Sequence, residues 1–150
     1  MHTQLSPEEI KNKLSQFGMK ATHQRIVVYN ALQHMFIHPS AEDVYTIIHS
    51  DNPSISLATV YNTLDSFVDA KLISKISSQE GKCRYDFNTH QHHHIYVTNT
   101  DEIIDYHDAE LQELIESYLK KKNISNLSIQ ELQVHIKAEK INPEKRIGIH

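Results

Sequence analysis

The sequence of 150 residues has a formal net charge of −4 at pH 7 and an apolar share of 39%. That length allows one compact domain or two small ones and leaves little chain for a large enzyme cleft. The apolar runs are too short to span a membrane and the polar N-terminus does not match a signal peptide, so we expect a soluble cytoplasmic protein with no membrane partner. A single cysteine, Cys83, excludes an intramolecular disulfide and a multi-cysteine zinc site within one chain.

Residues 1–70 repeat one pattern, in which a capping side chain is followed by an amphipathic helix and a helix stop. Ser6 and Glu9 form a capping box around a proline at the first helical position, and Gly18 ends this helix. Thr22 caps a second helix that we expect to end near residues 38–39, because the position before a proline disfavours helix.

Two more helices follow, capped by Ser40 and Ser56. In the second of them the spacing of apolar residues predicts a buried stripe, which consists of Leu57, Val60, Leu64, Phe67 and Val68. The outward residues between them are small, polar or aromatic, and no carboxylate appears before Asp65. They are Ser56, Ala58, Thr59, Tyr61, Asn62 and Thr63.

Residues 72–76 and 82–87 then predict a β-hairpin. Three helices and a two-stranded wing, with one helix in front, form a winged helix-turn-helix, in which the helix before the wing enters the major groove of DNA. Small polar residues and an aromatic ring can lie against phosphates and thymine methyl groups. We therefore predict a DNA-binding domain over residues 1–87. Its expected groove contacts are Ser56, Thr59, Tyr61 and Asn62.

The pattern changes over residues 88–150, which predict a small α/β domain. A second hairpin (94–97 and 102–106) precedes a helix that begins at Asp108, and a further strand is expected within residues 127–136. So small a unit buries little apolar surface by itself, and we predict that it forms a homodimer through residues 111–119 and the strand near Val134. The chain from Ala138 onward is expected to be loosely ordered. The predicted fold class is α+β.

Histidine is unusually frequent, with twelve in the chain, and four of them lie within five residues: His90, His92, His93 and His94. In an extended segment His92 and His94 point the same way and His93 points the opposite way. A four-residue loop over 98–101 would set His94 across from Asp105, with Cβ atoms about 5 Å apart. Two imidazoles and a carboxylate without a thiolate suit Fe(II), Mn(II) or Zn(II).

The remaining donors give a weaker pattern. Asp86 is expected to face away from the apolar side of its strand, and Cys83 to be a small core residue rather than a sensor. A single strand histidine is more often structural than a ligand. The histidines without partners at a defined spacing are therefore interpreted as structural, and they are His23, His34, His49, His107 and His135.

Several segments in order along nearly the whole chain resemble the Fur family of bacterial metalloregulators. They are GMKATHQR (18–25), HPSAEDVY (38–45), SLATVYNTL (56–64), RYDF (84–87), the histidine cluster, and IIDY (103–106). The resemblance implies a homodimer that binds double-stranded operator DNA, with Lys20 reaching the minor groove and Arg25 near the backbone, although Arg25 equally fits a structural ion pair. It also implies a regulatory ion, Fe(II) or Mn(II), with Zn(II) in purified protein as another possibility. The implied ligands are His38, Asp86, His92, His94 and Asp105.

Two residues resemble the peroxide-sensing branch of this family, because Asp105 and Asn62 stand where iron-uptake regulators usually carry Glu and Arg. That likeness implies a repressor in which hydrogen peroxide, reacting at bound Fe(II), oxidises His38 or His92 and releases the protein from DNA. Five bonds to one ion would fix the angle between the two domains. Loss of one ligand would leave that angle free to change.

The chain departs from the family where a structural zinc is commonly held by two Cys-x-x-Cys pairs. Val97–Thr100 and the segment 143–148 lack those cysteines, so no structural zinc is expected and the dimer would depend on apolar burial alone. Gln91 and Gln130 stand near positions where iron-uptake regulators carry a further histidine site.

Two other functions stay open at this stage. One is an iron, manganese or zinc uptake regulator of the same family that senses metal without peroxide chemistry. The other is a His/Asp metalloenzyme or metal buffer, which we disfavour because the ligand set fills the coordination sphere and leaves no general base beside an open position. We therefore do not expect an enzyme.

Overall fold

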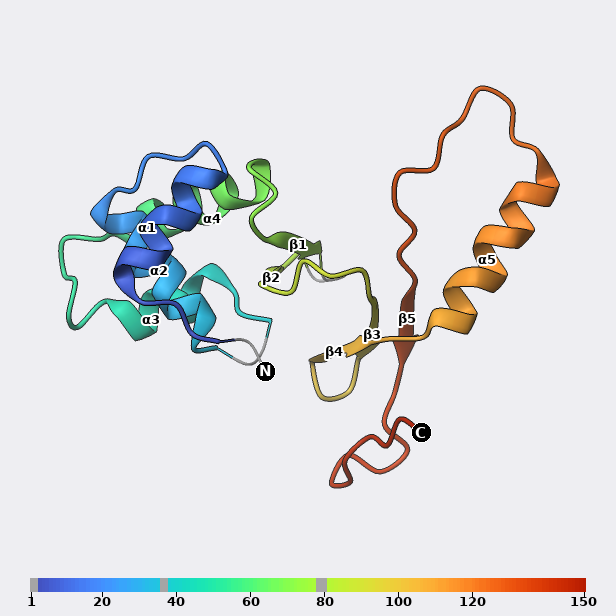
Figure 1. Ribbon diagram of the computed structural model, residues 1–150. Helices are drawn as coiled ribbons and strands as arrows, with labels where there is room; N and C mark the ends of the chain where they lie inside the picture. The colour runs from blue at the N-terminus through green and yellow to red at the C-terminus, as the bar shows by residue number, and fades with distance from the viewer. Residues whose placement is uncertain (1–2, 36–37, 78–80) are drawn as a thin grey trace. The chain divides into compact units, whose positions relative to one another are not determined.

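The computed structural model describes residues 3–35, 38–77 and 81–150, and the chain divides into two compact units, Met1–Thr89 and His90–His150 (Figure 1). This division lies two residues beyond the boundary expected from the sequence. Among the described residues, no helix combines the length and the apolar character that crossing a bilayer requires.

Four helices make up most of the first unit: α1 (Pro7–Gln16), α2 (His23–Gln33), α3 (Ala41–Ile48) and α4 (Leu57–Asp69). Each begins where the sequence predicts, because a capping hydroxyl accepts the backbone N–H three residues ahead. The capping hydroxyls belong to Ser6, Thr22, Ser40 and Ser56. The predicted end of α2 was wrong, since the helix ends at Gln33, well before Pro39.

The core of this unit lies where the four helices and the hairpin meet. Tyr29 lies at its centre, with its ring edge-on to Phe67 at 6.2 Å and to Phe87 at 5.1 Å between centroids. The apolar stripe of α4 is buried or half-buried as predicted. Thr63 corrects the predicted outward face, because it is 7% exposed and belongs to the buried side of the helix.

The hairpin of the first unit consists of β1 (Ser74–Ser77) and β2 (Cys83–Asp86), paired antiparallel with Tyr85 opposite Lys75. Both strands are shorter than the predicted ranges, and part of the turn between them lies outside the described residues. Together with α2, α3 and α4 the hairpin gives the predicted winged helix-turn-helix.

The second unit is a three-stranded sheet in the order β4-β3-β5 with one helix, made of β3 (His93–Val97), β4 (Glu102–Tyr106), α5 (Ala109–Lys122) and β5 (His135–Ala138). β3 and β4 are antiparallel in the predicted register, with His94 opposite Asp105. β5 runs parallel to β3 and places His135 beside His94. The predicted strand over 127–136 was therefore placed too early, and Ala138, expected in a loose tail, ends a strand.

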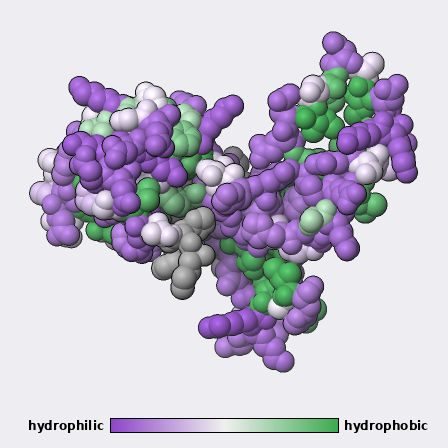
Figure 2. Space-filling model, in the orientation of Figure 1, coloured by the Kyte–Doolittle hydropathy of each residue, from purple (hydrophilic) through white to green (hydrophobic). Residues whose placement is uncertain are grey.

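The helix α5 begins as predicted, with the Asp108 carboxylate accepting the Leu111 N–H at 2.9 Å. Its apolar stripe is only partly covered within the chain, since Leu114 is 68% exposed and Tyr118 56% exposed. Further apolar side chains at the surface follow the helix, and Figure 2 shows them as green patches around α5 and the segment after it. They are Ile124, Leu127 and Ile129.

Candidate metal centre

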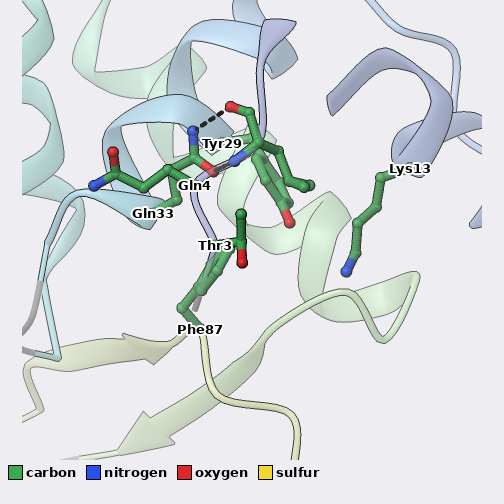
Figure 3. A pocket seen from close by; sticks show the side chains of 7 residues that line it. Thr3, Gln4, Lys13, Tyr29, Gln33 and Phe87 are labelled. Atoms are coloured by element: carbon green, nitrogen blue, oxygen red, sulfur yellow. Dashed lines mark hydrogen bonds between the residues drawn. The ribbon is translucent and has the colours of Figure 1, made fainter. Parts of the chain in front are cut away.

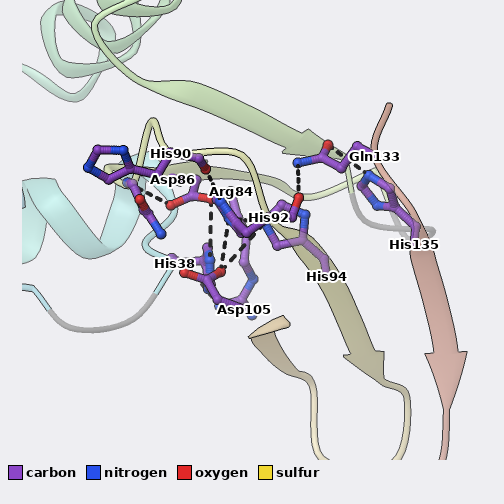
Figure 4. Close-up of polar contacts among 10 residues, drawn as sticks. His38, Arg84, Asp86, His90, His92, His94, Asp105, Gln133 and His135 are labelled. Carbon is purple, nitrogen blue, oxygen red and sulfur yellow. Dashed lines mark hydrogen bonds and ion pairs between the residues drawn. The ribbon is translucent and has the colours of Figure 1, made fainter. Parts of the chain in front are cut away.

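In the first unit a histidine and a carboxylate meet. His38 Nε2 lies 3.7 Å from Asp86 Oδ2, and their side chains are 11% and 4% exposed (Figure 4). A carboxylate this deeply buried is costly unless a cation or donors compensate its charge. The pair therefore offers one imidazole nitrogen and one carboxylate oxygen to a positive ion.

The backbone holds these two residues together. The Tyr85 N–H donates to the Pro39 carbonyl at 2.9 Å, which ties the entry to α3 to strand β2. Arg84 donates from its guanidinium to the His38 carbonyl at 3.2 Å. Asp86 Oδ1 accepts the Asn88 N–H at 2.8 Å, which fixes the carboxylate after the strand. Sequence spacing could not find this pairing, because it joins segments about 46 residues apart through backbone contacts.

The second unit holds three donors around one point: His92, His94 and Asp105 (Figure 4). The Nε2 atoms of the two histidines are 3.0 Å apart, and they lie 3.2 and 3.6 Å from Asp105 Oδ1. Both imidazoles are buried, whereas the Asp105 side chain is 28% exposed. The predicted pairing of β3 with β4 brings His94 and Asp105 together, because residues directly opposite on antiparallel strands share a face. His92 lies one residue before β3.

The spacing of these atoms fits a metal ion. Ligand bonds of about 2.0–2.2 Å around one ion separate neighbouring donor atoms by about 3 Å. His92 Nδ1 lies 2.5 Å from the carbonyl oxygen of His90, which can only accept. The ring proton therefore sits on Nδ1, and Nε2 keeps the lone pair that a metal ligand needs. Two nitrogens and one carboxylate oxygen are a donor set for Fe(II), Mn(II) or Zn(II).

Three other histidines lie close to the triad in the chain or in space. His93 is 2% exposed, points away from its neighbours as predicted, and accepts the Val134 N–H on Nδ1 at 3.1 Å. The ring of His135 lies 5.3 Å from that of His94, and the ring of His107 lies 5.5 Å from that of His92. Burial and the neighbouring His94 lower the pKa of His135. No pattern in the sequence predicted these two contacts, because both depend on tertiary packing.

The predicted DNA contacts lie on the first unit, and most of them are exposed. Lys20, Ser56, Tyr61 and Asn62 are exposed and Thr59 is half-buried against the Ser56 hydroxyl. The Tyr61 hydroxyl donates to the Glu42 carboxylate, which lowers the pKa of Glu42 and raises that of Tyr61. Arg25 donates to the Lys20 carbonyl at 2.8 Å, so it holds the turn before α2.

A small cavity of about 100 Å³ lies elsewhere in the first unit, beside Tyr29 (Figure 3). The Gln33 amide closes it by bonding the N–H and the carbonyl of Leu5, both at 2.8 Å. Its lining contains no histidine, cysteine or carboxylate, and consists of Thr3, Gln4, Leu5, Lys13, Tyr29, Gln33 and Phe87. It therefore offers neither metal ligands nor a general base.

Comparison with known proteins agrees with this fold and donor set. The model of the ferric uptake regulator family matches residues 16–136. The peroxide-responsive repressor PerR of Staphylococcus aureus (strain USA300) is 35% identical over 107 residues, which are 71% of this chain and 72% of that protein. The chain belongs to the ferric uptake regulator family. Members of this family regulate transcription and are not enzymes.

Solved structures of family members have the same fold. The Campylobacter jejuni peroxide stress regulator has a TM-score of 0.65 at 29% identity, over 91% of this chain and 96% of that one. The Pseudomonas aeruginosa ferric uptake regulator with manganese has a TM-score of 0.75 at 24% identity, over 89% and 98%. This family's fold combines the helical DNA-binding domain with an α/β dimerisation domain, as predicted.

The structural zinc of the family does not fit this chain. The turn Val97–Thr100 has no thiolate, and the one cysteine, Cys83, lies half-buried on β2 of the first unit. Gln91 and Gln130 line a pocket of about 260 Å³ in the second unit, where the Gln91 amide donates to the Leu132 carbonyl at 3.4 Å. Both of these side chains are amides, and amides are weak ligands for transition metals.

Proposed function

We propose that this protein is a metal-dependent transcriptional repressor that senses hydrogen peroxide through oxidation of a histidine in its metal site. The observation that carries this proposal is the triad of His92, His94 and Asp105, whose donor atoms lie 3.0–3.6 Å apart in a chain 35% identical to a peroxide-responsive repressor. Nitrogen and oxygen donors leave Fe(II) free to react, whereas a site of thiolates would itself be the oxidised group.

The regulatory ion in this proposal has five ligands: the triad together with His38 and Asp86. Two features support the assignment. The His38–Asp86 pair has the same donor chemistry as the triad, and a carboxylate that is 4% exposed is stabilised by a shared cation. One ion bound by residues of both units would hold them at one angle, and that angle sets the spacing of two recognition helices on an operator.

In this proposal, hydrogen peroxide oxidises His38 or His92. A bound Fe(II) ion supplies the chemistry that activates hydrogen peroxide beside an imidazole. Transfer of one oxygen atom from peroxide to a ring carbon leaves water as the other product, and the modified ring is a weaker ligand. His92 is held for this by the His90 carbonyl, which keeps its Nε2 in the triad.

DNA binding and dimer formation complete the proposal. Ser56, Thr59, Tyr61 and Asn62 are the expected groove contacts of α4, and Lys20 is the expected minor-groove contact. The homodimer forms through the exposed apolar side of α5, where Leu114 and Tyr118 would otherwise remain in water. Such a dimer acts on operator DNA in the cytoplasm.

The decisive experiment is mass spectrometry of protein loaded with Fe(II) and briefly exposed to hydrogen peroxide, with the Mn(II)-loaded protein as the control. We expect a gain of one oxygen on the peptide that contains His38 or His92 in the iron form, together with loss of operator binding. His107, which lies beside His92 without donating to the triad, is the internal control and should stay unmodified.

Unmodified peptides in both metal forms, with operator binding kept, would contradict peroxide sensing. That result would favour the second candidate, a regulator that responds to the metal alone. The same triad supports this candidate, because binding an ion through His92, His94 and Asp105 requires no oxidation.

A further inference from the structure

The turn where the family commonly carries its first zinc-binding cysteine pair makes a different set of contacts here. The Thr98 N–H donates to the Ala138 carbonyl at 2.9 Å, one step beyond the last pair of the β3–β5 ladder, Val97 with Ala138. Asn99 then contacts the backbone of Lys140 twice. Its Oδ1 accepts the Lys140 N–H at 3.0 Å, and its Nδ2 donates to the Lys140 carbonyl at 2.9 Å.

These two bonds satisfy both backbone polar groups of one residue, as a neighbouring strand would. The Asn99 side-chain amide thus extends the sheet past Ala138, where β5 itself has ended. A side-chain amide presents its oxygen and one N–H on the same side, as a strand residue presents its own C=O and N–H, so it can take the place of a strand residue. β5 is an edge strand of only four residues, so two additional hydrogen bonds at its C-terminal end should stabilise its pairing with β3.

A charge pair closes the same contact. Lys140 Nζ lies 2.7 Å from Glu102 Oε2, and the Lys140 side chain is 12% exposed. The hydrogen bonds from Lys140 and Thr100 lower the pKa of Glu102. Because Glu102 is the first residue of β4, this pair connects the C-terminal segment with the second strand of the hairpin.

We propose that Thr98, Asn99, Glu102 and Lys140 form a metal-free staple that fastens the C-terminal segment to the β3–β4 turn, in place of the family's structural zinc. β3 carries His94 at one end and the staple at the other, so the staple also keeps β5 beside the metal ligands. The inference rests on family membership and on these contacts, and it stands whether or not the protein senses peroxide.

Hydrogen exchange of the full-length protein tests the staple at the amide of Lys140. Asn99→Ala removes both bonds, and we expect this amide to exchange at least about tenfold faster. The thermal midpoint should also fall by about 3–8 °C. Glu102→Gln keeps the shape and removes the charge, and it should accelerate exchange less, because a half-exposed ion pair contributes little.

The matched control is Asn142→Ala, which removes an asparagine from the same segment whose Oδ1 bonds only locally, to the Glu144 N–H at 3.0 Å. We expect wild-type exchange at Lys140 in this variant and in wild-type protein treated with a metal chelator. Exchange in Asn99→Ala equal to wild type would overturn the proposal. So would a rise in wild-type exchange on chelation that matches the Asn99→Ala rate, because a metal would then be holding the segment.

Discussion

At the scale of single residues, the chemistry of the triad depends on which ring nitrogen carries the proton. The His90 carbonyl accepts from His92 Nδ1 and so leaves Nε2 as the donor atom. His94 reaches the same point from inside the sheet, where it is 2% exposed. Both imidazoles are therefore fixed before any ion arrives, which favours tight binding because little side-chain freedom is lost.

Replacing His94 by alanine tests the triad directly. We expect Mn(II) affinity, measured by isothermal titration calorimetry, to fall at least about a hundredfold, because loss of a ligand costs more than loss of a group that orients one. His107→Ala is the control, since its ring lies beside His92 and outside the triad, and it should bind nearly as wild type. Equal affinity in the two variants would show that the ion binds elsewhere.

At the scale of elements, the N-terminal cap of α3 positions the chain at His38. The α3 cap is a reciprocal box in which Ser40 Oγ accepts the Asp43 N–H at 3.2 Å and Asp43 Oδ2 accepts the Ser40 N–H at 2.9 Å. This box follows His38 and Pro39 directly. The cap therefore fixes both the start of the helix and the direction of the chain at His38.

Ser40→Ala should lower the free energy of unfolding by about 1 kcal/mol, because the Asp43 N–H loses its acceptor. The measurement is chemical denaturation followed by circular dichroism. Ser50→Ala, beyond the C-terminal end of α3, should change the unfolding free energy by less than about 0.5 kcal/mol. If Ser50→Ala lowered the free energy of unfolding as much as Ser40→Ala, the capping box would make no specific contribution to stability.

At the scale of the whole molecule, the helix α5 of the second unit keeps apolar side chains exposed in the single chain. No residue of α5 is buried within the chain, although its sequence has the periodicity of a packed helix. We therefore propose that the helix stripe binds a second copy of the chain, which would agree with the α/β dimerisation domain of the family.

Leu114→Glu should convert the proposed dimer to a monomer in analytical ultracentrifugation and weaken operator binding, because two charges would face each other across a symmetric interface. Leu114 is 68% exposed, so the substitution should leave the fold of each subunit intact, as circular dichroism can verify. Glu113→Gln, at the neighbouring exposed position, should remain dimeric. A stable dimer of Leu114→Glu would place the interface elsewhere.

The sequence by itself determined the features that depend on neighbours along the chain. Caps at Ser6, Thr22, Ser40 and Ser56 began their helices as predicted, because the capping bond spans three residues. The pairing of His94 with Asp105 was also predictable, since a short loop fixes the register of a hairpin. These local rules gave the fold class and three of the proposed ligands.

Tertiary structure decided the features that join distant segments. The contact of His38 with Asp86, the parallel pairing of β5 with β3 and the bonds of Asn99 to Lys140 span about 40 residues or more, and the sequence pattern contains no period that encodes them. The family resemblance predicted His38 as a ligand, whereas the spacing of residues along the sequence did not. Such contacts form when segments that are each marginal alone become stable by packing together, so only the folded chain reveals them.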